Sequence, residues 1–209
     1  MSNMNKFWLV LIGLVMSYGV SAASYTEGTE FIKIQKTVQN APRVVEFFSF
    51  YCPHCYQFES VYHVSQTVAK NLPKDIKMER YHVDFLGPLG AELTKAWTVA
   101  MVLKVEDKVS PLLFEGIQKS ESINTPADIK AVFIKAGVKS EEYDAALNSF
   151  VVKSLVVKQQ QAANDFQLRG VPAMFVNGKY MVRNNGITIE NADHYAKAYS
   201  DVVNFLISK

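Results

Sequence analysis

Two cysteines separated by two residues are the part of this sequence best suited to chemistry. Cys52 and Cys55 flank Pro53 and His54, and the 209-residue chain holds no other cysteine. Two thiols at this spacing can close a small disulfide ring, whereas a four-cysteine zinc site needs two more ligands. The pair therefore indicates thiol–disulfide exchange, with Cys52 exposed as the attacking thiolate and Cys55 shielded as the thiol that resolves the mixed disulfide.

The segment around the cysteines predicts that Cys52 lies at the N-terminus of a helix. The β-branched and aromatic run at residues 44–50 is typical of a buried strand. Pro53 directly after Cys52 is a helix-start signal, and apolar residues recur at helical spacing over residues 58–72. Because the helix N-terminus and the imidazole of His54 favour an anion, we expect a lowered pKa for Cys52 and a disulfide that passes readily to another thiol.

The N-terminus predicts export. Residues 1–6 hold one lysine, residues 7–16 are nearly all apolar, and residues 20–22 supply the small–x–small pattern of a signal-peptidase site. We therefore expect a signal peptide at residues 1–22, removed after Ala22. As a membrane anchor the apolar stretch would span only about 25 Å as a helix, which is short of the roughly 30 Å hydrocarbon core.

Composition and charge exclude several classes of function. The formal net charge is +2, and removal of the 22-residue leader with its one lysine leaves 187 residues at +1. Such a chain gives no electrostatic footprint for nucleic acid or anionic lipid. His63, His82 and His194 lack metal-ligand spacing to the cysteines, so we expect neither a metal nor a cofactor. A chain of this length needs no disulfide to hold its core together, so the cysteine pair is not mainly a scaffold.

Strands are predicted at both ends of the mature chain, with helices between them. The predicted strands are residues 30–34, 44–50, 76–83, 173–176 and 180–183, and the later predicted helices are 89–100, 125–136, 140–147, 152–168 and 193–207. Asn177-Gly178 between the last two strands is a strong signal for a type I′ hairpin. This order indicates an α/β core, formed by residues 23–84 and 164–209, that is split by a helical insertion at residues 85–163.

Three features together resemble the thioredoxin superfamily, and within it the DsbA family of periplasmic thiol:disulfide oxidoreductases. They are the Cys-Pro-His-Cys motif after a strand, Gly170-Val171-Pro172 immediately before a hairpin, and the helices between them. The resemblance covers essentially the whole mature chain. It implies a thioredoxin fold with an inserted all-helical domain, and a cis bond between Val171 and Pro172 packed against the cysteines.

The resemblance also implies an activity and partners. The expected protein is a monomeric oxidase in the periplasm of a Gram-negative bacterium. It donates its disulfide to unfolded exported proteins with free cysteines, and the inner-membrane partner DsbB with its quinone oxidises it again. Backbone groups of Val171 would pair with an extended substrate segment. Such pairing recognises the main chain of the substrate and does not depend on its sequence. The side chains that match the family's substrate groove are Tyr62, Leu86, Pro172 and Tyr195.

Glu46 places a carboxylate in the apolar central strand, where it is costly unless paired or protonated. In the resembled family a buried acid at this position is associated with proton movement at the resolving cysteine. Its basic partner matches Arg80 here, where lysine is expected, so a proton relay and a structural ion pair both stay open. Arginine's permanent charge predicts a firmly ionised Glu46 and a loss of roughly 3–5 kcal/mol when one partner is removed.

Two other functions would also place a cysteine pair in an exported protein. A disulfide isomerase or reductase would use the same chemistry, but such isomerases usually carry a dimerisation domain, and we identify none before residue 30. A periplasmic holdase would keep the disulfide as a structural element. Replacement of both cysteines by serine distinguishes a holdase from an oxidase, because a holdase keeps its activity and an oxidase loses it.

Overall fold

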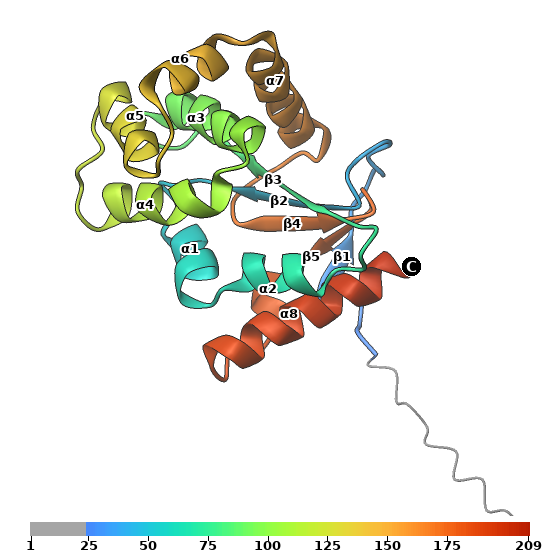
Figure 1. Ribbon diagram of the computed structural model, residues 1–209. Helices are drawn as coiled ribbons and strands as arrows, with labels where there is room; N and C mark the ends of the chain where they lie inside the picture. Colours follow the sequence, from blue (N-terminus) through green and yellow to red (C-terminus); the bar gives the residue numbers. More distant parts are fainter. Residues whose placement is uncertain (1–23) are drawn as a thin grey trace, which may run out of the picture.

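The computed structural model describes residues 24–209 and is built on a five-stranded sheet (Figure 1). The predicted signal peptide at residues 1–22 and its cleavage site lie outside the described residues. The strands are β1 (Phe31–Lys33), β2 (Val44–Phe48), β3 (Met78–His82), β4 (Ala173–Val176) and β5 (Tyr180–Val182), in the order β1-β5-β4-β2-β3. β2 and β3 run parallel, and the other neighbours are antiparallel.

Helices cover both faces of the sheet, and a group of them reaches beyond one end of it. They are α1 (Pro53–Tyr56), α2 (Val64–Asn71), α3 (Gly90–Leu103), α4 (Glu106–Gln118), α5 (Pro126–Lys135), α6 (Ser140–Asn148), α7 (Phe150–Asp165) and α8 (Ala192–Ile207). Helices α2 and α8 lie side by side on one face, whereas α3 to α7 gather on the other side and beyond the sheet (Figure 1). This is the predicted α/β fold, a thioredoxin fold with an inserted group of helices.

The apolar core reaches from the sheet into the inserted helices. Alternate residues of β2 point to opposite faces, so Val44 packs toward α8 and Phe47 toward Phe166 after α7. Phe48 and Phe50 continue instead into the helical insertion, where the ring of Phe50 lies 4.8 Å from that of Phe114. The end of β2 that leads to Cys52 is therefore buried by the insertion.

The single helix predicted from residue 53 to residue 72 is broken. After α1 the chain forms one π-helical segment, η1 (Gln57–Val61), and His63 then takes a left-handed φ of 54° before α2 begins. A π turn inserts one extra residue, so every later side chain is rotated around the helix axis. In this segment Phe58 packs against Tyr199 of α8, and Glu59 is buried. The apolar spacing predicted the first of these contacts but not the burial of Glu59.

Helix α4 was not among the predicted helices, while two predicted local signals are confirmed. Pro111 lies inside α4, and an interior proline normally argues against a helix. Thr125 and Asp128 form the capping box expected at the start of α5. Asn177 and Gly178 both have positive φ, as a type I′ hairpin requires.

Candidate redox-active site

Strand β2 and helix α1 place Cys52 at the N-cap of the helix. Its backbone is extended, and its Sγ accepts a hydrogen bond of 3.2 Å from the backbone N–H of Cys55. Pro53 occupies the first helical position, as the sequence predicts. Both cysteines are free thiols, so the structure represents the dithiol form.

The Cys52 sulfur is more enclosed than expected. Only 7% of Cys52 and 2% of Cys55 is exposed, so the expectation of an openly exposed Cys52 is wrong. The cause is the loop before β4, because the Cys52 thiol donates a hydrogen bond of 3.3 Å to the carbonyl of Val171. The peptide bond between Val171 and Pro172 in that loop is cis, as the resemblance implied. His54, two residues after Cys52, is exposed.

The environment separates the two thiols in acidity. A hydrogen bond from the Cys55 thiol is the largest influence on Cys52 and lowers its pKa, and burial opposes it. Backbone N–H groups of Cys55 and His54, and the charge of His54, also lower the pKa of Cys52. Together, all these influences bring it from 9.0 to about 7. Burial raises the pKa of Cys55 far above its ordinary value, and the charge of Cys52 adds to that rise. One sulfur is therefore the available thiolate, and the other holds its proton.

A groove of about 450 Å³ opens beside the loop that covers Cys52. Three of the four groove-matched residues line it, namely Tyr62, Pro172 and Tyr195, together with Val171 and His54. The rings of Tyr62 and Tyr195 are 5.3 Å apart. Leu86 is not among the lining residues; it packs between the core of the insertion and the cluster around Phe47.

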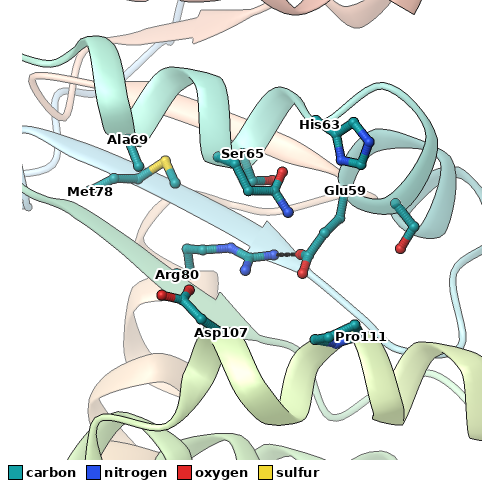
Figure 2. Close-up of a pocket in the computed structure, with 10 residues that line it drawn as sticks. Glu59, His63, Ser65, Ala69, Met78, Arg80, Asp107 and Pro111 are labelled. Carbon is teal, nitrogen blue, oxygen red and sulfur yellow. Dashed lines mark hydrogen bonds and ion pairs between the residues drawn. The ribbon is translucent and has the colours of Figure 1, made fainter.

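Arg80 lies between two buried carboxylates. Its Nε donates to Glu46 at 2.9 Å, from the neighbouring position of the parallel β2–β3 pair, and its Nη2 donates to Glu59. Ser65 donates to Glu46 at 3.0 Å and Ser110 donates to Glu59. Figure 2 shows Arg80 turned toward Glu59 at a cavity of about 360 Å³.

The second carboxylate changes the expected electrostatics of Glu46. Burial raises the pKa of Glu46 above 4.5, the charge of Arg80 opposes this, and the charge of Glu59 adds to it. Burial alone would lower the pKa of Arg80, but the two carboxylates reverse this and raise it. Because one guanidinium is shared by two acids, Arg80 favours the ionised form of Glu46 less strongly than it would in an isolated pair.

Two further side chains bind the backbone near Cys52. Gln118, the last residue of α4, donates to the carbonyls of Phe50 at 2.7 Å and Cys52 at 2.9 Å. His82 accepts from the N–H of Phe50 at 3.1 Å and lies 2.8 Å from the hydroxyl of Thr94. Burial lowers the pKa of His82 to about 3, so it is neutral near pH 7. In the sequence His82 has no metal-ligand spacing to the cysteines, and no periodicity or motif singled out Gln118.

The described residues define what else this site contains. Among residues 24–209, no cluster of three or more histidine, cysteine or carboxylate side chains is arranged to hold a metal ion. No helix within the same residues is long and apolar enough to cross a membrane.

Comparison with known proteins finds relatives that match nearly the full length of the chain. The model of the DSBA-like thioredoxin domain matches residues 43–195. Thiol:disulfide interchange protein DsbA of Yersinia pestis is 60% identical over 206 residues, which are 99% of this chain and 100% of that protein. An Escherichia coli DsbA is 56% identical over 207 residues, with the same coverage of both chains.

Solved structures agree with the sequence relatives. DsbA of Proteus mirabilis, in a cysteine-to-serine form with a non-covalently bound peptide, has a TM-score of 0.86 and 60% identity. It covers 90% of this chain and 100% of its own. DsbA of Klebsiella pneumoniae has the same TM-score and coverage at 41% identity. The chain belongs to the DsbA family of thioredoxin-fold thiol:disulfide oxidoreductases.

Proposed function

We propose that this protein is a periplasmic dithiol oxidase that passes its Cys52–Cys55 disulfide to newly exported, unfolded proteins with free cysteines. The observation that carries the proposal is the placement of the two thiols, because Cys52 Sγ caps helix α1 and accepts the backbone N–H of Cys55, whereas Cys55 is buried. The pKa of Cys52 is lowered to about 7, whereas that of the buried Cys55 is raised. A disulfide in which one sulfur is a good leaving group favours transfer to an ordinary thiol.

The exchange proceeds in two displacements. A client thiolate attacks Cys52 Sγ of the oxidised protein, the bond between the two enzyme sulfurs breaks, and Cys55 leaves and takes up a proton. A second client thiolate then attacks the client sulfur of the mixed disulfide, and Cys52 leaves as the stabilised thiolate. The client loses two electrons and gains a disulfide, and the protein is left as the dithiol.

The lowered pKa of Cys52 also adds to the driving force once the pH exceeds about 7. Each unit by which this pKa falls below the ambient pH stabilises the dithiol form by about 1.4 kcal/mol, or about 30 mV of oxidising potential. The helix N-terminus and His54 contribute to that fall, so Pro53 and His54 in the motif act on the potential.

Client binding is proposed along the groove beside Cys52. Val171 offers its backbone at the edge of the loop, and an extended client segment would pair with it as an added strand. Tyr62, Pro172 and Tyr195 would supply apolar contact. Leu86 would act on this groove only through the packing behind it.

The remaining parts of the proposal concern the cycle. Each turnover leaves a dithiol, so an electron acceptor must restore the disulfide, and the family resemblance supplies the inner-membrane protein DsbB and its quinone. The predicted signal peptide supports the periplasm of a Gram-negative bacterium as the compartment. We propose that the protein acts as a monomer.

Oxidation of a reduced, unfolded client by the purified oxidised protein tests the proposal. Stoichiometric loss of client thiols is expected. The Cys55→Ser variant, supplied as its Cys52–glutathione mixed disulfide, should exchange glutathione for the client thiol and hold the client as a Cys52-linked mixed disulfide. Equilibration in defined glutathione buffers should give a potential well above that of the buffer pair. If the variant with both cysteines replaced by serine protects a client as well as the native protein, the holdase interpretation is correct. Rearrangement of mispaired clients without net oxidation would indicate an isomerase.

A further inference from the structure

The loop that covers Cys52 has a second polar attachment, on its other carbonyl. The carbonyl of Val171 accepts a hydrogen bond from the Cys52 thiol, and the next carbonyl, that of Pro172, accepts a hydrogen bond of 2.8 Å from Nδ2 of Asn184. Proline has no N–H, so these two carbonyls and the N–H of Val171 are the backbone groups by which this turn can be held. Asn184 begins the short 3₁₀ turn after β5, far from the cysteines in sequence.

Helix α8 holds Asn184 in turn. The hydroxyl of Tyr199 donates to Oδ1 of Asn184 at 3.0 Å, and the hydroxyl of Tyr195 donates to its backbone carbonyl at 3.1 Å. The amide orientation is fixed by chemistry, because the Pro172 carbonyl can only accept and Nδ2 must face it. Tyr199 is fully buried, and burial raises its pKa well above 10, so it stays a donor.

These contacts connect α8 to the reacting sulfur through one amide. From α8 the chain of contacts runs from Tyr199 to Asn184, then to Pro172, and through Val171 to Cys52. The position of the Val171 backbone decides whether an extended client segment can pair beside the sulfur. An amide fixed by buried side chains of α8 is better suited to set that position than a surface loop held by its own backbone.

We propose that Asn184 is a positioning residue for exchange with polypeptide substrates, which rests on the proposed function of the same groove. It holds the Val171–Pro172 turn where a client segment pairs with Val171 while its sulfur reaches Cys52. The chemistry of the two thiols does not need Asn184, since neither sulfur contacts it. Loss of its donor should therefore impair polypeptide substrates and spare small thiols.

Asn184→Asp tests this with little change of shape. The carboxylate keeps an acceptor for Tyr199 but turns a second acceptor toward the Pro172 carbonyl, so the turn loses its donor and meets a negative charge. Asn185→Asp is the matched control. Asn185 is the next residue and lines the same groove, and its replacement by aspartate adds the same negative charge. Tyr199→Phe is a second variant, which frees the amide and adds no charge.

The measurement is the second-order rate constant for reduction of each oxidised protein by two reagents. One is an unstructured peptide with a single cysteine, and the other is dithiothreitol, which reaches Cys52 without strand pairing. The ratio of the peptide rate to the dithiothreitol rate removes any effect on thiol chemistry. We expect Asn184→Asp to lower this ratio roughly fivefold below that of Asn185→Asp, about the value of one hydrogen bond. Tyr199→Phe should lower it about twofold relative to the native protein.

Equal ratios for the two aspartate variants would overturn the proposal, since charge alone would then account for the loss. An equal fall with both reagents, together with a lower melting temperature, would show a merely structural role and would also overturn it. If Asn184→Asp does not fold, an unchanged ratio in Tyr199→Phe overturns the proposal. A native protein that dithiothreitol reduces but that oxidises no peptide would instead contradict the proposed function.

Discussion

At Cys52, the sulfur of the second cysteine acts more strongly than the residues between the two. The Cys55 thiol and backbone N–H both donate to Cys52, whereas the charge of His54 is the smallest of the groups that lower its pKa. Burial of Cys52 works against all of them. The dipeptide between the cysteines therefore adjusts the acidity of a thiolate whose main stabilisation comes from hydrogen bonds donated by Cys55.

His54→Ser should raise the pKa of Cys52 by less than about one unit, because the helix and Cys55 contributions remain. The redox potential should fall by up to about 30 mV for that unit. Titration of thiolate absorbance measures the pKa, and glutathione equilibration measures the potential. His194→Ser is the control, since His194 is an exposed first-turn residue of α8. An unchanged or lower Cys52 pKa in His54→Ser would contradict the prediction.

Glu46→Gln should change the free energy of unfolding by less than about 1 kcal/mol at pH 8, and not by the larger loss expected for an isolated buried pair. Glu59 keeps Arg80 paired after the substitution. Because burial raises the pKa of Glu46, its contribution to stability is present below its ordinary pKa and is lost as pH rises through the folded value. The free energy of unfolding of Glu46→Gln should therefore increase relative to that of the native protein as pH rises.

Denaturant melts of both proteins between pH 5 and pH 8 check this, with the exposed Glu115→Gln as the control. A loss of several kcal/mol at pH 8 would show that Glu46 and Arg80 form an isolated pair after all. Exchange rates with a thiol peptide on the same variant address the relay. Tenfold or greater slowing with unchanged stability would assign Glu46 to proton transfer.

Among the elements, α4 connects the helical insertion to the nucleophile. Its last residue, Gln118, binds two carbonyls on either side of the turn from β2 into α1. The same turn is bound from β3 by His82. Both side chains come from elements that differ from the one carrying the cysteines, so the active-site turn has little conformational freedom of its own.

Gln118→Met should lower the free energy of unfolding by about 1–3 kcal/mol, because a thioether of similar size leaves the carbonyl of Phe50 without this donor. The carbonyl of Cys52 keeps its bond from the N–H of Tyr56. Gln160→Met is the control, since the exposed side chain of Gln160 binds only that of Asp84, and its loss should change stability by under about 0.5 kcal/mol. Equal effects of the two variants in urea melts would disprove the role of Gln118.

The elements also show what the sequence could predict. The capping box at Thr125, the hairpin at Asn177 and the helix start at Pro53 depend on local backbone chemistry, which a sequence expresses directly. Helix α4 contains Pro111 and is stabilised by packing of buried residues such as Phe114, which no local signal reports. The π turn after α1 has no sequence signature either. Burial of Glu59 follows from that turn, so its place beside Arg80 could not be predicted.

For the whole molecule, the redox state should set how stability depends on pH. The pKa of Cys52 is about 7 in the folded dithiol against an ordinary 9.0, so its ionisation stabilises the reduced fold at high pH. That contribution is lost as pH falls through about 7. The oxidised fold has no Cys52 thiol to titrate. The stability of the reduced form relative to the oxidised form should therefore rise from about pH 7 toward pH 9.

Guanidinium melts of both forms at several pH values test this difference. Buried groups such as His82, whose pKa of about 3 makes acid destabilising, titrate in both forms and cancel when the two are subtracted. A difference that stays constant from pH 6 to pH 9 would show that Cys52 is not the acidic thiol.

The separation in sequence between Cys52 and the loop that covers it has a consequence for biogenesis. The Cys52 thiol and the Val171 carbonyl are 119 residues apart, and β2 completes its pairing only when β4 arrives from the far side of the insertion. A polypeptide that emerges from a translocation channel N-terminus first exposes the Cys52–Cys55 pair long before that strand. The groove thus assembles among the last parts of the molecule. A chain still in transit carries two reactive thiols but no substrate groove, so it is at that stage a client for a finished copy and not yet a catalyst.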